Sequence, residues 1–169
     1  QYSILGVKLI LSSRRADILA NIKSECSYPK NIKILPFDLI DFKSASEIVN
    51  SAFKIFGTVD ILINNAGVSQ RSLIINTKFE VYRKLIEINY LGHIAISNAI
   101  LPYFIGQGGG TYVIISSVMG KYSSPYRSGY AAAKHALHGF FDSLRMEHQK
   151  DNIFVTIVCP GFVNTPISK

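Results

Sequence analysis

Cysteine is scarce in this sequence, with Cys26 and Cys159 the only two among 169 residues. Two thiols so far apart along the chain provide neither a disulfide framework nor the ligand set of a metal cluster. We therefore expect two buried, unreactive thiols, no bound metal and a reduced, intracellular setting. The sequence does not separate a cytoplasmic location from one at the endoplasmic reticulum membrane.

Charged residues are also few, at 17%, against 48% apolar residues, which excludes a disordered chain and favours a sheet covered on both faces. The net charge of +7 comes from 18 basic and 11 acidic residues, but the lysines are scattered and form no basic run. A nucleic-acid-binding protein would show a basic stripe or a recognition motif. We expect no nucleic-acid partner, and an anionic small ligand suits the charge better.

The stretch from Ile88 to Gly120 contains no charged residue at all. A membrane-spanning helix would need about 20 consecutive apolar residues, whereas His93, Asn98, Pro102 and a glycine-rich segment interrupt this stretch. A buried helix followed by a buried strand explains it better. No signal peptide opens the sequence, so a membrane anchor is possible only outside residues 1–169.

Apolar runs and amphipathic segments alternate along the chain, which predicts one α/β domain with a Rossmann-like, doubly wound parallel sheet and helices on both faces. Ser44 with Glu47, and Thr77 with Glu80, have the spacing of capping boxes at two helix starts. Residues 1–6 resemble the end of a helix. The predicted strands are 7–12, 32–37, 59–63, 111–116 and 153–158, and the predicted helices are 13–26, 44–56, 77–103 and 128–150.

Three residues that can carry chemistry lie between 117 and 134. Tyr130 and Lys134 are four apart, so they share one face of the predicted helix. A cation close to a phenol favours the phenolate, which makes Tyr130 a candidate proton donor and acceptor. Ser117 follows the 111–116 strand, at the carboxyl edge where ligands bind in open α/β sheets. A Tyr-x-x-x-Lys pair alone is a weak signal, because an exposed helix face is its commoner origin.

Other features point to the same sheet edge. Asn64-Asn-Ala-Gly67 directly follows a buried strand, where small residues let a ligand approach the backbone. Asn89 lies inside a predicted helix with glycine three residues later, and this poor local propensity suggests a functional exception. The segment from Pro160 to Thr165 follows the last strand.

In these motifs the sequence resembles the short-chain dehydrogenases/reductases, in their single-domain form. The resemblance covers nearly the whole chain. It implies a hydride transfer between a nicotinamide coenzyme and a small carbonyl or alcohol substrate, with Tyr130 as proton donor or acceptor. Ser117 would bind the substrate oxygen, Lys134 would assist Tyr130 and bond the ribose, and Asn89 would hold a connecting water. It assigns coenzyme contacts to Asp38, Leu39, Asn65, Ala66, Gly67, Tyr130, Lys134, Pro160, Gly161 and Thr165.

The segments 125–135 and 140–145 resemble, more narrowly, the subgroup called dehydrogenase/reductase family member 7, especially its B form. One departure is plain, because the first strand and the glycine-rich phosphate loop of the family have no counterpart here. The substrate-covering helices and the last strand have none either. We therefore expect a truncated domain, incomplete at both ends, and residues 1–169 alone to be aggregation-prone and inactive.

The choice of coenzyme can be argued from the end of the 7–12 strand. An acidic residue there would select NAD, whereas an arginine accommodates the 2′-phosphate of NADP. Arg14 and Arg15 stand at this place with no carboxylate, so NADP(H) is expected and NAD(H) is possible. The same resemblance implies that the two long helices pack against their counterparts in a homodimer or homotetramer. A non-catalytic nucleotide-binding or scaffold protein and a nucleotide-sugar epimerase or dehydratase remain the alternative functions.

Overall fold

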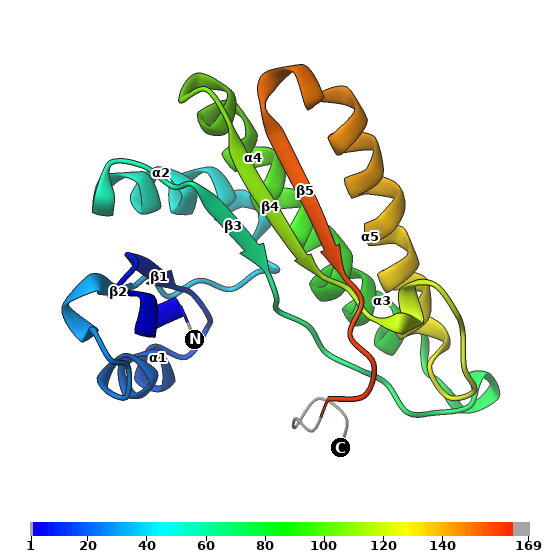
Figure 1. The fold of residues 1–169 in the computed structure, drawn as a ribbon. Coiled ribbons are helices and arrows are strands. Elements are labelled where there is room, and N and C mark those ends of the chain that lie inside the picture. The colour runs from blue at the N-terminus through cyan, green and yellow to red at the C-terminus, as the bar shows by residue number, and fades with distance from the viewer. Residues whose placement is uncertain (1, 164–169) are drawn as a thin grey trace.

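The computed structural model describes residues 2–163, and all five of its strands are parallel. They form two sheets, not the single sheet expected from the sequence (Figure 1). The first sheet pairs β1 (Leu9–Leu11) with β2 (Ile32–Ile34). The second has the order β3-β4-β5, formed by Ile61–Asn64, Gly110–Ile115 and Ile153–Val158.

The register of the second sheet aligns the carboxyl ends of its strands. Asn64 at the end of β3 pairs with Ile114, and Ile115 at the end of β4 pairs with Val158 at the end of β5. Parallel strands place the residues that follow them at one common edge, where ligands bind in open α/β sheets. The segments beginning at Asn65, Ser116 and Cys159 therefore leave the sheet side by side.

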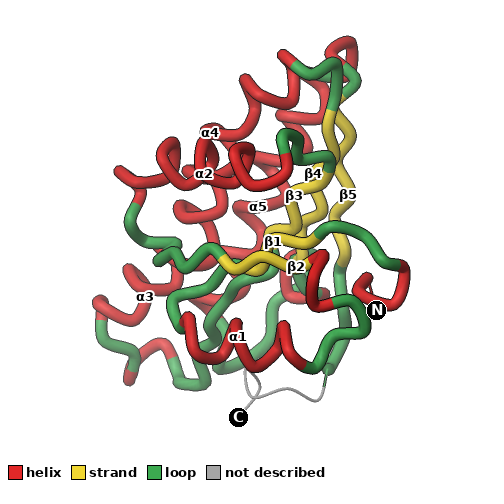
Figure 2. The backbone as a smooth tube through the Cα atoms, turned by 90° about the vertical axis from the view of Figure 1, so that its left-hand side faces the viewer, coloured by secondary structure: helices red, strands yellow, loops and turns green. Residues whose placement is uncertain are grey.

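Within residues 2–163, five α-helices accompany the strands, and α2, α3, α4 and α5 gather on one side of the β3-β4-β5 sheet, whereas α1 lies with β1 and β2 (Figures 1 and 2). A π-helical turn, Glu87–Leu91, joins α3 directly to α4. The long helix expected over 77–103 is therefore two α-helices with one wider turn between them. The helices are α1 (Ala16–Ser24), α2 (Ala45–Phe56), α3 (Phe79–Ile86), α4 (Gly92–Gly106) and α5 (Ser128–Glu147).

The core lies between the β3-β4-β5 sheet and its helices. Tyr112 and Ile114 of β4 are fully buried against Phe104 of α4 and Phe141 of α5. The Phe104 and Tyr112 rings meet edge to face, with centroids 5.1 Å apart, a favourable aromatic geometry. β4 is therefore the central strand on which both long helices pack.

The opposite face of the same sheet carries apolar side chains that no helix of the described residues covers. Ile61 and Ile63 of β3 and Phe154 of β5 are 48%, 40% and 64% exposed. The continuous apolar strands predicted a sheet buried on both faces, and their composition still fits that prediction. In residues 2–163, only the side that carries the helices is buried.

The two predicted capping boxes do not form, although α2 begins where predicted, with Ser44 at its N-cap. Ser44 stands at the start of α2, but its hydroxyl donates to Asp41 Oδ2 over 2.6 Å and makes no capping bond. Thr77 lies before α3, and its hydroxyl donates to the carbonyl of Leu73 over 2.7 Å. Both hydroxyls satisfy a nearer local acceptor, a competition open to serine and threonine at every helix start.

The uncharged stretch 88–120 forms α4 and β4, as the sequence predicted. Over the described residues, none of the helices combines the length and hydropathy needed to cross a bilayer.

Candidate functional site

Ser117 stands where the chain leaves β4 for a short turn, Val118–Gly120, that packs against α5. Its side chain is 9% exposed, and its Oγ accepts a hydrogen bond from Met119 N over 3.1 Å. Val118 N donates to the carbonyl of Pro160 over 3.0 Å, which ties this turn to the segment after β5. The Ser117 hydroxyl hydrogen is still available for a further acceptor.

Lys134 is buried in α5, one turn after Tyr130. Its side chain is 3% exposed, and Nζ donates to the carbonyl of Ile115, the last residue of β4, over 2.7 Å. The ammonium lies 5.8 Å from the centre of the Tyr130 ring. Burial lowers the pKa of Lys134 from 10.5 to about 8, because the charged form loses its hydration.

Asn89 lies in the π-turn and is completely buried. Its Oδ1 accepts from Val68 N and its Nδ2 donates to the carbonyl of Val68, each over 2.8 Å. The predicted break in helix propensity is therefore a real break in the α-helix, and the side chain fastens the loop after β3. Each end of the amide thus makes one bond to Val68, and the predicted water held by Asn89 stays a prediction.

His93, one turn after Asn89, was not recognised from the sequence as part of the site. It is 1% exposed, with Nδ1 3.1 Å from the Asn64 side-chain amide and Nε2 2.8 Å from the carbonyl of Ala66. Burial lowers its pKa to about 4, a hydrogen bond to Ala66 opposes this, and the charge of Lys134 lowers it further. The ring is therefore neutral at pH 7, and a single histidine in an uncharged stretch was the only signal for it.

The neutral ring of His93 has one N–H to give. The carbonyl of Ala66 can only accept, and it is the closer partner, so the hydrogen belongs on Nε2. Asn64 lies with Oδ1 3.1 Å from Nδ1 and with Nδ2 donating to Ser97 Oγ over 2.9 Å. Nδ1 is then an acceptor, and exchanging the two ends of the Asn64 amide would give it a donor, with the Ser97 hydroxyl donating to the amide oxygen. This chain of bonds fixes the loop after β3 against α4.

Gly92 follows the π-turn where the segment after β2 crosses α4. A Cβ at this position would lie 2.5 Å from Leu39 Cγ and 2.6 Å from the carbonyl oxygen of Leu39. Only glycine allows this approach. The adjacent Asp38 is half-buried, and its Oδ1 accepts from Ile40 N over 3.3 Å. The absent side chain at Gly92 thus lets Leu39, one of the predicted coenzyme contacts, lie directly against α4.

The remaining predicted coenzyme residues lie at the strand ends and are more exposed. Asn65 and Ala66 are exposed and Gly67 half-buried after β3, and Pro160 and Gly161 follow β5. Arg14 and Arg15 are exposed at the start of α1, in the other sheet unit. The structure therefore brings Asn89, Ser117, Tyr130 and Lys134 together around the end of β4 but leaves the arginines in a separate unit. Thr165 lies outside the described residues.

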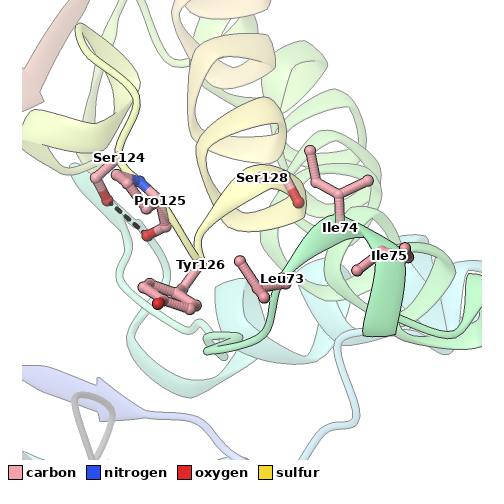
Figure 3. Close-up of a pocket in the computed structure, with 7 residues that line it drawn as sticks. All are labelled: Leu73, Ile74, Ile75, Ser124, Pro125, Tyr126 and Ser128. Carbon is pink, nitrogen blue, oxygen red and sulfur yellow. Dashed lines mark hydrogen bonds between the residues drawn. The ribbon is translucent and has the colours of Figure 1, made fainter.

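Two further polar interactions near the site were not predicted. The first is made by Gln70, which is 5% exposed and connects the loop after β3 to the start of α5. A hollow of about 330 Å³ lies beside this junction, with a mostly apolar lining (Figure 3). It is formed by Leu73, Ile74, Ile75, Ser124, Pro125, Tyr126 and Ser128.

The second is a contact between Ser116 Oγ and His138 Nε2, 3.0 Å apart behind the turn that follows Ser117. Cys159 lies nearby, with Sγ 3.8 Å from the same nitrogen. Both cysteines have free thiols, as expected, but both are only half-buried, so the predicted full burial is wrong. Among residues 2–163 no three histidine, cysteine or acidic side chains gather in a way that could hold a metal ion.

Comparison with known sequences gives a consistent result across the chain. The profile of the family described as short chain dehydrogenase matches residues 2–169. The human protein named dehydrogenase/reductase SDR family member 7 is 43% identical over 99% of this chain and 51% of its own length. Member 7B of the mouse is 40% identical over 96% of this chain and 52% of its own. The predicted resemblance to this subgroup is confirmed, and the chain spans about half the length of these relatives.

Solved structures agree with the fold. The complex described as ElxO with NADP bound has a TM-score of 0.92 and 30% identity, covering 98% of this chain and 67% of that one. A short-chain dehydrogenase from Streptomyces avermitilis has a TM-score of 0.90, also at 30% identity, over 96% of this chain and 59% of that one. The predicted arrangement of parallel strands and surrounding helices is confirmed.

Proposed function

Because the chain belongs to the short-chain dehydrogenase/reductase family, we propose that the complete protein interconverts a carbonyl and a secondary alcohol with NADP(H) as the preferred coenzyme. Members of this family are oxidoreductases, so a nicotinamide dinucleotide is the expected cofactor. In the proposed reaction the bound coenzyme supplies or accepts the hydride. The residues of this chain would bind and orient the reactants and move the accompanying proton.

The observation that carries the proposal is the buried cation beside a tyrosine. An ammonium has three N–H donors, and Lys134 gives one of them to Ile115. Two donors are then free for the hydroxyls of a ribose, while the charge lies 5.8 Å from the Tyr130 ring. A charge buried at this cost suits a binding or catalytic site better than a structural one. These groups fit a dinucleotide bound along the edge at the ends of β3, β4 and β5.

Tyr130 and Ser117 would act on the substrate oxygen. The phenol hydroxyl of Tyr130 gives its proton to the carbonyl oxygen during reduction and recovers it during oxidation. The Ser117 Oγ accepts a hydrogen bond from Met119 N, so its O–H remains free to donate to the substrate oxygen. A donor held in place before the reaction stabilises developing negative charge by about 3 to 4 kcal/mol. Asn89 would hold a water that connects Lys134 to solvent.

The two arginines support the choice of NADP(H). Arg14 and Arg15 are exposed just past β1, the place where an acidic residue would select NAD. A guanidinium binds phosphate oxygens in a fixed fork and loses little entropy in doing so. We propose Arg14 as the residue that binds the 2′-phosphate of NADP(H). NAD(H) is the alternative coenzyme, bound less tightly.

Replacing the hydroxyl of the proton donor tests the proposal directly. Tyr130→Phe in the complete protein should abolish NADPH-dependent reduction of carbonyl compounds while leaving NADPH binding, measured by fluorescence titration, largely intact. Tyr103→Phe is the matched control, because Tyr103 stacks on Phe53 and lies on α4, outside the site. A Tyr130→Phe enzyme that keeps more than about a tenth of the wild-type rate would rule out this role, since general acid-base catalysis contributes about 10²- to 10⁴-fold.

We further expect the complete protein to be a homodimer or homotetramer. Apolar side chains remain exposed on the helices, among them Leu91, Ile105 and Met146, which are 39%, 39% and 72% exposed. Apolar surface of this kind is commonly covered by a partner. Light scattering at micromolar concentration should give at least twice the monomer mass. A location at an intracellular membrane is compatible with an anchor outside residues 1–169.

A further inference from the structure

The helix that carries Tyr130 and Lys134 has no cap of its own. Arg127 precedes α5, and its side chain makes no capping hydrogen bond. The N–H groups of a first helical turn have no partner within the helix, so they need one from elsewhere. The N–H of Gly129 donates to Gln70 Oε1 over 2.9 Å, and Gln70 comes 59 residues earlier in the chain. A side chain of the loop after β3 therefore takes the place of a local N-cap.

The other end of the same amide gathers three hydroxyls. Gln70 Nε2 lies 3.3 Å from Ser72 Oγ, 3.2 Å from Thr77 Oγ1 and 3.3 Å from Ser128 Oγ. The Gln70 side chain is 5% exposed, so water does not reach it and these contacts are its hydrogen-bond partners. Removing them would leave buried polar groups without partners, which is costlier than losing an exposed hydrogen bond.

The first turn of α5 is also held by close packing. A Cβ on Gly129 would lie 2.7 Å from Tyr82 Cδ1, 2.8 Å from Leu85 Cδ1 and 2.9 Å from Gln70 Oε1, so only glycine fits. Two more bonds join the same segments, from Arg127 to Ser69 Oγ and from Ser72 N to the carbonyl of Tyr126. The apolar hollow of Figure 3 is bordered by these segments. The loop after β3 and the start of α5 thus form one bonded unit.

We propose that Gln70 is a positioning residue for Tyr130, acting through the cap that it places on Gly129. Tyr130 is the next residue, so the hydrogen bond from Gly129 to Gln70 fixes the position of the first turn of α5, which carries the proton donor. The same loop begins with Asn65, Ala66 and Gly67, the predicted coenzyme contacts. Gln70 therefore couples the position of the coenzyme to that of the proton donor. This inference rests on the proposed function, because it assigns Gln70 to the same reaction.

Three variants of the complete protein test it. Gln70→Leu removes both ends of the amide at similar size, whereas Gln70→Glu keeps an oxygen acceptor for Gly129 N–H at a helix start, where negative charge is favourable. Gln107→Leu is the control, because the side-chain amide of Gln107 also joins distant segments, by donating to the carbonyls of Val59 and Gly109, but lies before β4, at the opposite end of the strand from Ser117. The rate constant kcat for carbonyl reduction is read at the plateau of each pH profile, since the added carboxylate can displace the profile along the pH axis.

We expect Gln70→Leu to lower kcat by about 10- to 100-fold, because misplacement of a catalytic group by about 1 Å can cost 10²-fold. KM for NADPH should stay within about threefold, Gln70→Glu should recover most of kcat, and Gln107→Leu should match the wild type. A merely structural role would instead lower the melting temperature of Gln70→Leu and leave kcat unchanged. That result, or an equal loss of kcat in Gln70→Leu and Gln70→Glu, would overturn the proposal.

Amide hydrogen exchange of Gly129 separates failure of this inference from failure of the proposed function. Its exchange should accelerate at least about tenfold in Gln70→Leu and recover in Gln70→Glu, because exchange reports local opening. Unchanged exchange would overturn the cap whatever the activity. A wild-type protein that caps normally but reduces no carbonyl compound would overturn both the reaction and any role of Gln70 in it, while the cap itself would stand.

Discussion

The region around β4 and α5 and the region of β1, β2 and α1 are built differently. In the first, Asn89, Ser117 and Lys134 are at most 9% exposed, and each side chain is bonded to a neighbouring backbone group. In the second, the strands have three residues each, and Arg14 and Arg15 are exposed. These three side chains are held before any ligand arrives, whereas the arginines proposed to select the coenzyme remain in solvent.

The difference has a physical reason. A proton donor must meet the reacting atom within a few tenths of an ångström, so its supports belong to the core and contribute to folding. A guanidinium that binds a phosphate can adjust its long side chain when the ligand arrives. Substitutions in the first region should therefore change stability and its pH dependence, and those in the second should change ligand choice alone.

The largest effect is expected at Lys134. Below pH 8 the folded protein carries the full cost of the buried charge, about 3 kcal/mol for a pKa lowered from 10.5 to about 8. Between these pH values the unfolded chain holds a proton that the folded chain has lost, so the free energy of unfolding rises with pH. Lys134→Met should remove this rise and abolish activity. Urea denaturation from pH 7 to 10 measures it.

The difference between wild type and Lys134→Met isolates this group. Burial raises the pKa of Tyr112, whose ionisation in the unfolded chain lowers stability above pH 10, but that effect is common to both proteins. Parallel stability curves for the two proteins between pH 8 and 10 would show that the ammonium is not buried as described.

The stability of the fold at acidic pH depends on His93. Because its pKa is lowered from 6.5 to about 4, the unfolded chain takes up a proton first, and the free energy of unfolding falls as pH drops through this range, by up to about 3 kcal/mol. His93→Gln should flatten the fall between pH 6.5 and 4. His135→Gln, on the exposed side of α5, is the control and should keep it. Equal acid sensitivity in all three proteins would contradict a buried, neutral His93.

Two glycines of α5 give a pair of substitutions with opposite expected signs. Gly129→Ala forces a Cβ to within 2.9 Å of three side-chain atoms, which should cost about 1 to 3 kcal/mol of stability and lower activity. Gly139→Ala meets nothing within 4 Å and should stabilise the helix by up to about 1 kcal/mol. Thermal unfolding distinguishes them. Two shifts of the same sign would break the comparison.

The smallest effect on stability is expected at Arg14. Arg14→Ala should change the free energy of unfolding by less than about 0.5 kcal/mol, as for an ordinary surface substitution, yet lower the preference for NADPH over NADH about tenfold, the loss of about 1.4 kcal/mol. Arg83→Ala, which breaks an exposed ion pair with Glu87 on α3, is the control. An unchanged ratio of kcat/KM for the two coenzymes would remove Arg14 from the coenzyme site.

Elements marked by strong patterns could be predicted from the sequence. The strand predicted at 153–158 is β5 to the residue, and α5 begins at Ser128 as predicted. The poor helix propensity around Asn89 marked the π-turn. Each of these signals is local, because the backbone conformation there depends on the residues of the segment itself.

The rest depends on partners distant in sequence. Gln70 meets Gly129 across 59 residues, and His93 meets Ala66 across 27, so neither contact leaves a local pattern. The division into two sheets depends on which strands become neighbours in space, and the capping boxes failed because Ser44 and Thr77 had closer acceptors. The roles assigned to the site residues stay predictions until the variants are measured.

The π-turn also changes the phase of the helix. Leu85, Asn89, His93 and Ser97 are four residues apart, and all four are at most 2% exposed. In an α-helix of 3.6 residues per turn each step of four drifts by about 40°, so the last member would face about 120° away from the first. The one extra residue in the turn Glu87–Leu91 takes up most of this drift. A regular α-helix holding the same residues would lack this correction, so Ser97 would face about 120° away from Leu85 and one of the two would leave the interior.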